Sequence, residues 1–178
     1  MKVGNQDLFK KSSLESVDND FAIIVKKILE DDKLKKLLFY NTKDCLSKPN
    51  LTEEETFSLI GKQVRIVPKV EFEDENLTYL ILSFDSFSPN MTNPHYRDNI
   101  LIIDILCNFD QWDLGDFKLR PYQIASRLDV KLNEQHLTGI GTLQFLGMSE
   151  LPINDNISGL SLMYSAVHGK EDSNAEIG

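Results

Sequence analysis

Three aspartates at three-residue spacing are the side chains of this chain best suited to chemistry. Asp110, Asp113 and Asp116 lie in the run FDQWDLGDF. Two neighbouring carboxylates can act as acid and base in a hydrolysis. A calcium loop is not indicated, because it needs ligands at alternate positions and a distal glutamate. The same run is typical of a solvated loop between a strand and a helix. We favour the solvated loop, and keep a small hydrolytic or ligand-binding site as the alternative.

Other chemical motifs are weak or missing from the sequence. The histidines His95, His136 and His168 lack the spacing and the cysteine partners of a zinc site. Gly139 and Gly141 stand before a strand rather than a helix, so no helix N-terminus would receive a phosphate. Neither a nucleophile elbow nor a P-loop occurs. We therefore expect no catalytic residue, no metal site and no cofactor.

The charge balance points away from a general nucleic-acid-binding protein. The 178 residues include 28 acids and 19 bases, which gives a formal net charge of -9. Binding to a phosphate backbone needs clustered lysine and arginine. An acidic surface is consistent with plain solubility, or with the wall of a conduit through which nucleic acid slides without sticking. We expect no sequence-specific binding to nucleic acid.

The cysteines and the N-terminus bear on the compartment. Cys45 and Cys107 do not make a disulfide framework, which indicates a reducing compartment. Residues 1–13 have no apolar segment typical of a secretory signal. The longest apolar run is far shorter than the roughly 20 residues that cross a membrane. We expect a soluble protein made in the cytosol, with no membrane partner.

The first part of the folded chain is predicted to be helical. Residues 21–40 place apolar side chains at helical spacing, with Asp18 or Asn19 as the N-cap. Asp31 and Asp32 interrupt the apolar pattern. This interruption predicts a break between two helices.

Two further helices have clear start signals. Thr52 and Glu55 form a capping box, and their helix should stop at Gly61, which suits a left-handed C-terminal cap. Pro121 fits the first position of another helix, because the missing N–H of proline costs nothing there. Apolar side chains follow it at four-residue spacing and would lie on a sheet: Ile124, Leu128 and Leu132.

A change of period from about 3.6 to 2 residues marks the strands. Pro68 places the first strand at an edge or a bulge, because proline cannot donate to a ladder. Residues 100–109 are apolar on both faces and predict a central strand. Five segments are predicted as strands: residues 63–70, 77–87, 100–109, 137–148 and 160–167, the last two joined by a hairpin connection at 152–158.

The order of elements predicts an α+β fold. We expect a mostly antiparallel sheet of about five strands, with N-terminal helices and one amphipathic helix packed on a face. The length fits a single domain, which we place at residues 18–169. The polar segments 1–17 and 170–178 are expected to be flexible ends.

Two residues inside this framework have open roles. Asp104 lies mid-strand among isoleucines and leucines. If it is buried it needs a partner, such as Arg65, Arg97, Arg120 or Arg127; otherwise its strand face is partly solvated. Trp112 is either a cover of the core or an interface anchor, because aromatic side chains are enriched at interfaces. We favour the core cover.

Several of these segments carry a family resemblance. They are the helix end DDKLKKLLFYNT, the capped helix and strand LTEEETFSLIGKQVRIVPKV, the helix start RPYQIASRLD, and the pair LTGIGTLQFLG and GLSLMYSAVHG. Together with the long strand between them, they resemble tail-terminator and neck (head-to-tail connector) proteins of tailed bacteriophages. The resemblance covers residues 21–169. The long acidic loops exceed a minimal terminator, which leaves the station in the neck or tail open.

The resemblance implies a structural virion protein without enzymatic activity. Family members assemble into a ring, often a hexamer, that caps the tail tube or joins it to the head. Implied partners are other copies of the chain and neighbouring tail-tube, neck or connector proteins, with DNA passing through the lumen. The implied location is the virion, after assembly in the host bacterial cytoplasm. An unassigned adaptor or chaperone-like binding module is a further alternative.

Candidate contact residues follow from this hypothesis. Arginine is favoured at interfaces, because its planar fork pairs with carboxylates. The protruding segment 88–98 is a second candidate. The predicted interaction residues are Arg65, His95, Arg97, Trp112, Asp113, Asp116, Arg120 and Arg127.

Overall fold

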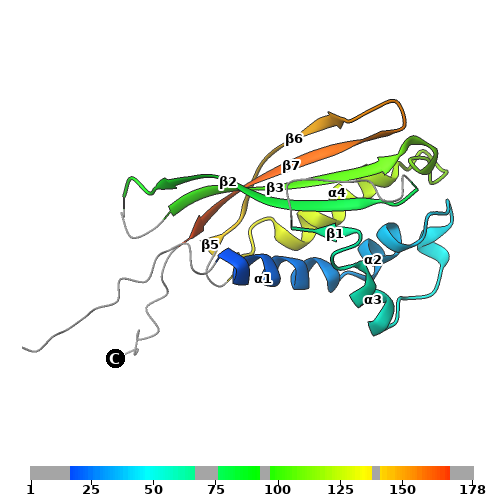
Figure 1. Cartoon of the computed structure of the whole chain (residues 1–178), viewed down its shortest axis with the longest axis horizontal. Helices are drawn as coiled ribbons and strands as arrows, with labels where there is room; N and C mark the ends of the chain where they lie inside the picture. Colours follow the sequence, from blue (N-terminus) through cyan, green and yellow to red (C-terminus); the bar gives the residue numbers. More distant parts are fainter. Residues whose placement is uncertain (1–16, 67–75, 93–96, 138–140, 169–178) are drawn as a thin grey trace, which may run out of the picture.

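The structure, a computed structural model, describes residues 17–66, 76–92, 97–137 and 141–168. These residues form the predicted α+β fold, a mostly antiparallel five-stranded sheet with helices packed on one face (Figure 1). The description begins with the first helix at Val17. Of the segments expected to be flexible, 1–17 and 170–178, only Val17 is described, and it belongs to this helix; the rest lies outside the described residues.

The helices follow the predicted order. The α-helices are α1 (Val17–Leu29), α2 (Asp32–Phe39), α3 (Glu53–Leu59) and α4 (Arg120–Leu132). Two single-turn 3-10 helices, η1 (Cys45–Ser47) and η2 (Phe109–Gln111), lie in the connections. None of the described helices is long and apolar enough to cross a membrane.

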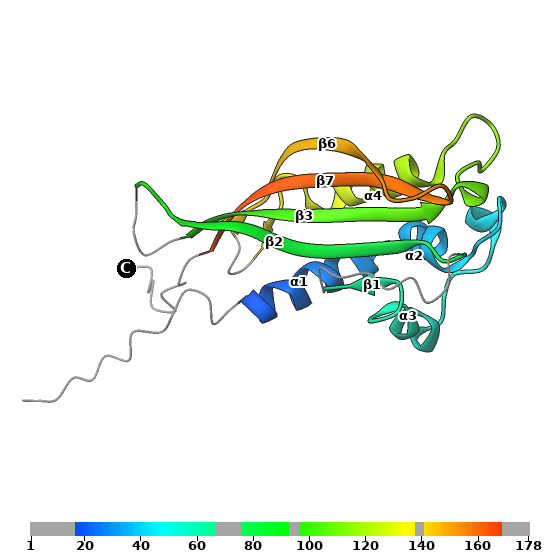
Figure 2. The same ribbon diagram turned by 45° about the horizontal axis from the view of Figure 1, so that its top comes forward.

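The strand order of the sheet is β1-β2-β3-β7-β6. Its strands are β1 (Val64–Arg65), β2 (Tyr79–Pro89), β3 (Arg97–Asn108), β6 (Gln144–Pro152) and β7 (Ile157–His168). Only the β1–β2 pair is parallel. As predicted, β3 is central. The two edges of the sheet are β1 and β6. Figure 2 shows these edges on opposite sides of the molecule, with α1 and α3 near β1.

Three boundaries differ from the prediction. Helix α1 begins at Val17, so Asp18 and Asn19 lie in its first turn and neither is its N-cap. The predicted strand 137–148 is divided: a small hairpin of β4 (His136–Leu137) and β5 (Gly141–Thr142) precedes β6, which continues to Pro152. The positive φ of Gly141, 73°, turns the chain at this point. The described part of the first predicted strand is only β1, and Pro68 lies outside the described residues.

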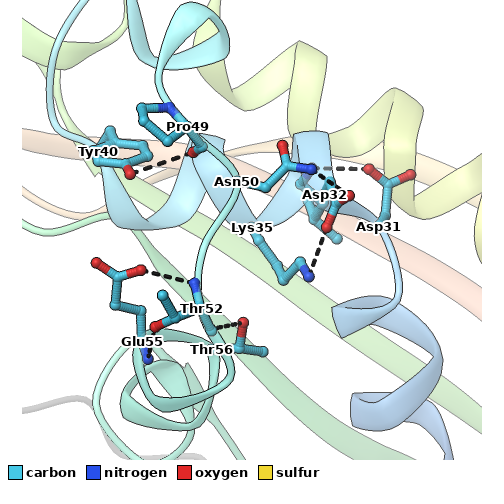
Figure 3. A network of polar contacts seen from close by, with 10 residues as sticks. Asp31, Asp32, Lys35, Tyr40, Pro49, Asn50, Thr52, Glu55 and Thr56 are labelled. Atoms are coloured by element: carbon cyan, nitrogen blue, oxygen red, sulfur yellow. Dashed lines mark hydrogen bonds and ion pairs between the residues drawn. The ribbon is translucent and has the colours of Figure 1, made fainter.

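The break between α1 and α2 is confirmed, and Asp31 explains it. Its carboxylate accepts the N–H of Leu34 at 2.9 Å, which caps α2. The predicted capping box of α3 is also present. Thr52 N–H donates to Glu55 at 2.8 Å, and Glu55 N–H donates to the Thr52 hydroxyl at 3.2 Å (Figure 3). Gly61 follows α3 with a φ of 79°, as expected for a left-handed cap.

The core lies between the sheet and the helices. The alternate residues of β2, β3 and β7 that face α1, α2 and α4 are almost fully buried: Leu80, Leu82, Leu101, Ile103, Ile105, Leu160, Leu162 and Tyr164. The predicted stripe Ile124, Leu128 and Leu132 packs α4 against them. Such two-layer packing removes one face of the sheet from water and leaves its edges to be covered by other means.

Asp104 lies on the face of the sheet opposite the helices. This side chain is half-buried, and the Ser161 hydroxyl of β7 donates to it at 2.6 Å. Its described partner is therefore a hydroxyl rather than an arginine, on a partly solvated face. Burial raises the pKa of Asp104, and the hydrogen bond from Ser161 opposes part of that rise.

Candidate functional site

The aspartate loop has the geometry of a solvated connection. Asp113 is exposed, forms an ion pair with Lys43 at 2.6 Å and accepts the N–H of Gly115 at 2.8 Å. The hydrogen bond from Lys43, the bond from Gly115 and the charge of Lys43 lower the pKa of Asp113. A general acid at neutral pH would need a raised pKa. Asp116 is exposed and adopts a left-handed φ of 51°.

No metal centre accompanies this loop. Across the described parts of the chain, no group of three histidine, cysteine, aspartate or glutamate side chains could hold a metal ion. Trp112, next to Asp113, is half-buried and donates its indole N–H to the Cys107 carbonyl at 3.4 Å. Its ring lies 5.5 Å from that of Phe109. Trp112 is not among the described half-buried apolar side chains that pack against the core, so its role as a core cover or an interface anchor remains a prediction.

Arg120 lies in the interior of the protein. Its guanidinium is 0% exposed and donates to four main-chain carbonyls. Nε donates to Gln111 at 2.9 Å, Nη1 to Leu37 at 2.6 Å and to Tyr40 at 2.9 Å, and Nη2 to Thr42 at 2.9 Å. Arg120 thereby joins the C-terminal end of α2 to η2, where a positive charge also complements the helix dipole.

Arg127 and Arg65 make contacts within the chain. Arg127 donates through Nε to Asp31 at 2.9 Å, and its Nη2 also donates to that carboxylate. This pair links α4 to the start of α2. Arg65 is buried, donates to the Lys62 carbonyl at 2.8 Å and stacks over Tyr79, 5.0 Å from the ring centre.

Two of the predicted contact residues remain, Arg97 and His95. Arg97 opens β3 and is half-buried. His95 lies outside the described residues. The structure thus spreads the seven described residues of the predicted set over several regions and does not gather them into one site. Whether any of them contacts a neighbouring subunit remains a prediction.

An apolar groove lies beside the β1 edge of the sheet. It has a volume of about 810 Å³ and is bounded by α1, α3 and the residues around β1. Val25, Leu29 and Val64 are its most buried apolar lining residues. Its exposed apolar side chains are Phe57, at 70% exposure, with Ile60 and Ile66. We call this the α1–α3 groove.

The β6 edge carries a second group of exposed apolar side chains. Phe145, Leu146 and Met148 of β6 and Tyr122 of α4 are all exposed. Phe145, Met148 and Tyr122 also border a smaller cavity of about 250 Å³ between α4 and β6. We call these four side chains the β6 ridge. Apolar side chains gathered at exposed positions are typical of interaction surfaces.

The YomW family model matches residues 31–166, which include the β6 ridge, the α3 and β1 sides of the α1–α3 groove, and the sheet up to Ala166 in β7. The chain belongs to the YomW family. YomW is a phage-derived family, which agrees with the phage resemblance of the sequence. The more specific expectation of a tail terminator remains a prediction.

The YomW fold has a counterpart among solved structures. A chain of the "Virion of native gene transfer agent (GTA) particle" superposes with a TM-score of 0.50 and 16% sequence identity. The match covers 84% of this chain and 94% of that chain. At this identity the likeness establishes a shared fold. No curated protein matched this YomW-family chain significantly.

Sequence reasoning missed the two apolar surfaces of this YomW protein. It selected charged side chains, and the structure uses Arg120, Arg127 and Arg65 to hold its own elements together. One signal was present: Phe57 stands alone on a helix that otherwise exposes Glu53, Glu54 and Ser58. A lone aromatic on a polar helix can mark a contact surface.

Proposed function

We propose that the protein is a structural subunit of a phage or phage-like particle, which assembles with copies of itself into a ring at the neck or the tail end. In this role it would join the tail to the head as a tail terminator or head–tail connector. Other copies and neighbouring tail-tube, neck or connector proteins are its partners. Its location is the virion.

The observation that carries the proposal is the combination of family and fold. The chain belongs to a phage-derived family, and its two-layer α+β fold resembles that of a chain in a gene transfer agent virion. Fold alone does not define function, so the exposed surfaces must also be compatible with a role in assembly. The described residues present exposed apolar groups at both edges of one sheet, which supports such a role.

The charge of the chain suits a ring around DNA. The net charge of -9 would make an acidic lumen wall that repels the phosphate backbone and lets DNA move. A ring built for passage needs no sequence-specific contact with bases. We propose passage through the lumen as the only relation of this protein to DNA.

The hydrolytic alternative receives little support. It requires a concave pocket around residues 110–116 with a carboxylate of raised pKa. Asp113 is exposed and its pKa is lowered. Neither the α1–α3 groove nor the cavity beside β6 is lined by a residue of this loop.

Two measurements test the proposal. The first is an immunoblot of purified particles from a strain that carries the gene, with a host cytosolic protein as the control for contamination. The second is the molar mass of the purified protein by light scattering over a range of concentration and salt, with negative-stain images. Presence in particles and closed rings support the proposal. Absence from intact particles would refute it.

A further inference from the structure

We propose that the cavity between α4 and β6 receives a lysine or arginine side chain from a different protein of the particle. The cavity has a volume of about 250 Å³. Its lining combines one carboxylate, that of Asp129, with apolar and aromatic walls. The inference names the chemistry of one partner contact, and it rests on the proposed function only for the identity of that partner.

Asp129 gives the cavity a negative charge that no neighbouring cation balances. It is the only charged residue among the seven that line the cavity. Within the described parts of the chain, Asp129 forms no ion pair, and its buried Oδ1 has no hydrogen-bond partner. A buried carboxylate oxygen without a partner is costly, so its presence in a native fold calls for an explanation. A cation that enters the cavity would pair with it.

The hydroxyl of Tyr164 is a second buried polar group beside this cavity. Tyr164 lies opposite Phe145 in the sheet, and the two rings are 5.5 Å apart. Its Oη is buried and has no hydrogen-bond partner of ordinary geometry among the described residues. Burial raises the pKa of Tyr164, and the neighbouring Asp129 carboxylate adds to the rise. An ammonium, with three donors, or a guanidinium, with five, has enough N–H groups for both oxygens.

The walls of the cavity suit the aliphatic stem and the charged tip of such a side chain. Leu162 and Met148 are apolar and can pack against methylene groups. Tyr122 and Phe145 are exposed aromatics at the rim, and the face of an aromatic ring attracts a cation. Pockets for free small molecules typically measure about 300–1,000 Å³. The smaller volume here favours a single side chain inserted from a polypeptide.

The charge around β6 favours a basic protein over a second copy of this chain. Residues 144–157, which contain β6 and its hairpin, include Glu150 and Asp155 and no lysine or arginine. The whole chain carries a net charge of -9, so a second copy would be repelled at long range. A basic segment would meet opposite charge, which speeds association and sets orientation.

A matched pair of peptides tests the cavity on the full-length protein. The probe is acetyl-Ala-Lys-Ala-amide. Its control carries norleucine in place of lysine, which keeps the aliphatic stem and removes the ammonium. We expect the lysine peptide to shift the amide NMR signals of Ser126, Asp129 and Met148, which border the cavity. It should bind at least about tenfold more tightly than the norleucine peptide, because a hydrogen bond to a charged group is strong.

Two variants that lose the same charge separate the cavity from general attraction. Asp129→Asn removes the charge inside the cavity and should abolish the difference between the peptides. Asp155→Asn removes a charge from an exposed position outside the cavity lining and should keep the difference. Tyr122→Ala removes an exposed aromatic wall and should weaken binding of the lysine peptide by about threefold.

The stability of the variants distinguishes a binding carboxylate from a structural one. An unpaired buried charge does not stabilise the fold, so Asp129→Asn should not lower the urea midpoint. A lowered midpoint for both Asp129→Asn and Tyr164→Phe would show that these two groups support each other within the fold, and would overturn the inference.

Three binding results would also overturn the inference. The first is equal affinity for the two peptides. The second is a loss of lysine-peptide binding in Asp155→Asn as large as the loss in Asp129→Asn. The third is an absence of shifts at the cavity, which is expected if ordered water alone satisfies Asp129 and Tyr164.

The partner is then identified in purified particles. Phe145 is replaced by the photoreactive benzoylphenylalanine, and the cross-linked peptide is sequenced by mass spectrometry. We expect a different particle protein, joined beside a lysine or arginine, and loss of this cross-link when Asp129→Asn is added. A cross-link to a second copy, or none, would overturn the partner assignment. Absence of the protein from particles would refute the proposed function, whereas the peptide measurements decide the cavity independently.

Discussion

The junctions where α4 meets α2 and η2 bury charged side chains, whereas the two edges of the sheet expose apolar ones. At the junctions, charged groups are buried and satisfied: Arg120 reaches four carbonyls and Arg127 reaches Asp31. At the edges, large apolar groups such as Phe57 and Leu146 are exposed. The difference teaches that polarity alone does not indicate burial here, because two arginines join elements in the interior while large apolar side chains at the edges are exposed.

This comparison predicts where substitutions act. Changes at the junctions should lower the free energy of unfolding. Changes at the edges should leave it almost unaltered and weaken assembly. Five predictions follow that order, from the largest expected effect on stability to the smallest.

Replacement of Arg120 should have the largest effect. Arg120→Met leaves the carbonyls of Leu37, Tyr40, Thr42 and Gln111 without their donor in a buried site. We expect a loss of about 3–5 kcal/mol in the free energy of unfolding, measured by urea denaturation. Arg120→Lys should recover little of it, because a single ammonium cannot reproduce the planar fork. A loss below about 1 kcal/mol would contradict the assigned role.

Glycine at position 159 should be required by close packing of two central strands. A Cβ on Gly159 would lie 1.6 Å from the Ile105 carbonyl oxygen, so Gly159→Ala must push β7 away from β3. We expect a loss of about 3 kcal/mol or more. Gly147→Ala is the control, since its Cβ would meet only Met163, at 4.0 Å. Equal stability of the two variants would refute the argument.

The Asp31–Arg127 pair should contribute less to the free energy of unfolding than Arg120 or Gly159. Asp31→Asn keeps a residue able to cap α2 and removes the charge that faces Arg127, so we expect a loss of about 1–2 kcal/mol at pH 7. Lys27→Gln, at the exposed pair with Glu30, should change stability by under about 0.5 kcal/mol.

The effect of Asp31→Asn should also depend on pH. Burial by itself raises the pKa of Asp31, but the hydrogen bonds from Arg127 and Leu34 and the charge of Arg127 outweigh it and lower the pKa. A lowered folded-state pKa gives stability that is present above the unfolded value and is lost as pH falls through the folded value. The difference between the wild type and Asp31→Asn should therefore shrink in acid. A difference that grows below pH 4 would contradict this assignment.

The edge variants should have the smallest effect on folding. Phe57→Asp and Leu146→Asp change exposed side chains, so we expect shifts in unfolding free energy under about 0.5 kcal/mol. The association constant should fall by about tenfold or more if these residues lie in the contact. Phe117→Asp, at a fully exposed position on the aspartate loop, should alter neither quantity. Urea denaturation and light scattering on the same samples measure both effects.

Local signals allowed much of the fold to be predicted. The capping box of Thr52 and Glu55 and the stop at Gly61 depend on residues within one turn of each other, and the structure confirms them. Helix α4 begins at Arg120, one residue before the start predicted at Pro121. The apolar run at residues 100–109 gave the central strand, because only a strand with a neighbour on each side and both faces packed tolerates such a run. The predicted start of α1 and the predicted continuous strand at 137–148 were wrong: α1 already includes Val17, and the local hairpin of β4 and β5 precedes β6.

The sequence by itself determined the class of fold and the order of its elements, because these follow from short-range periodicity and from the type of each residue. Only the tertiary structure decided which charges are buried and which apolar groups are exposed. Arg120 meets Leu37 across 83 residues, and no local pattern encodes that contact. Phe57 is likewise exposed because no other described element covers the side of α3 that borders the groove. Burial is a property of the packed chain, so the candidate site emerged only with the fold.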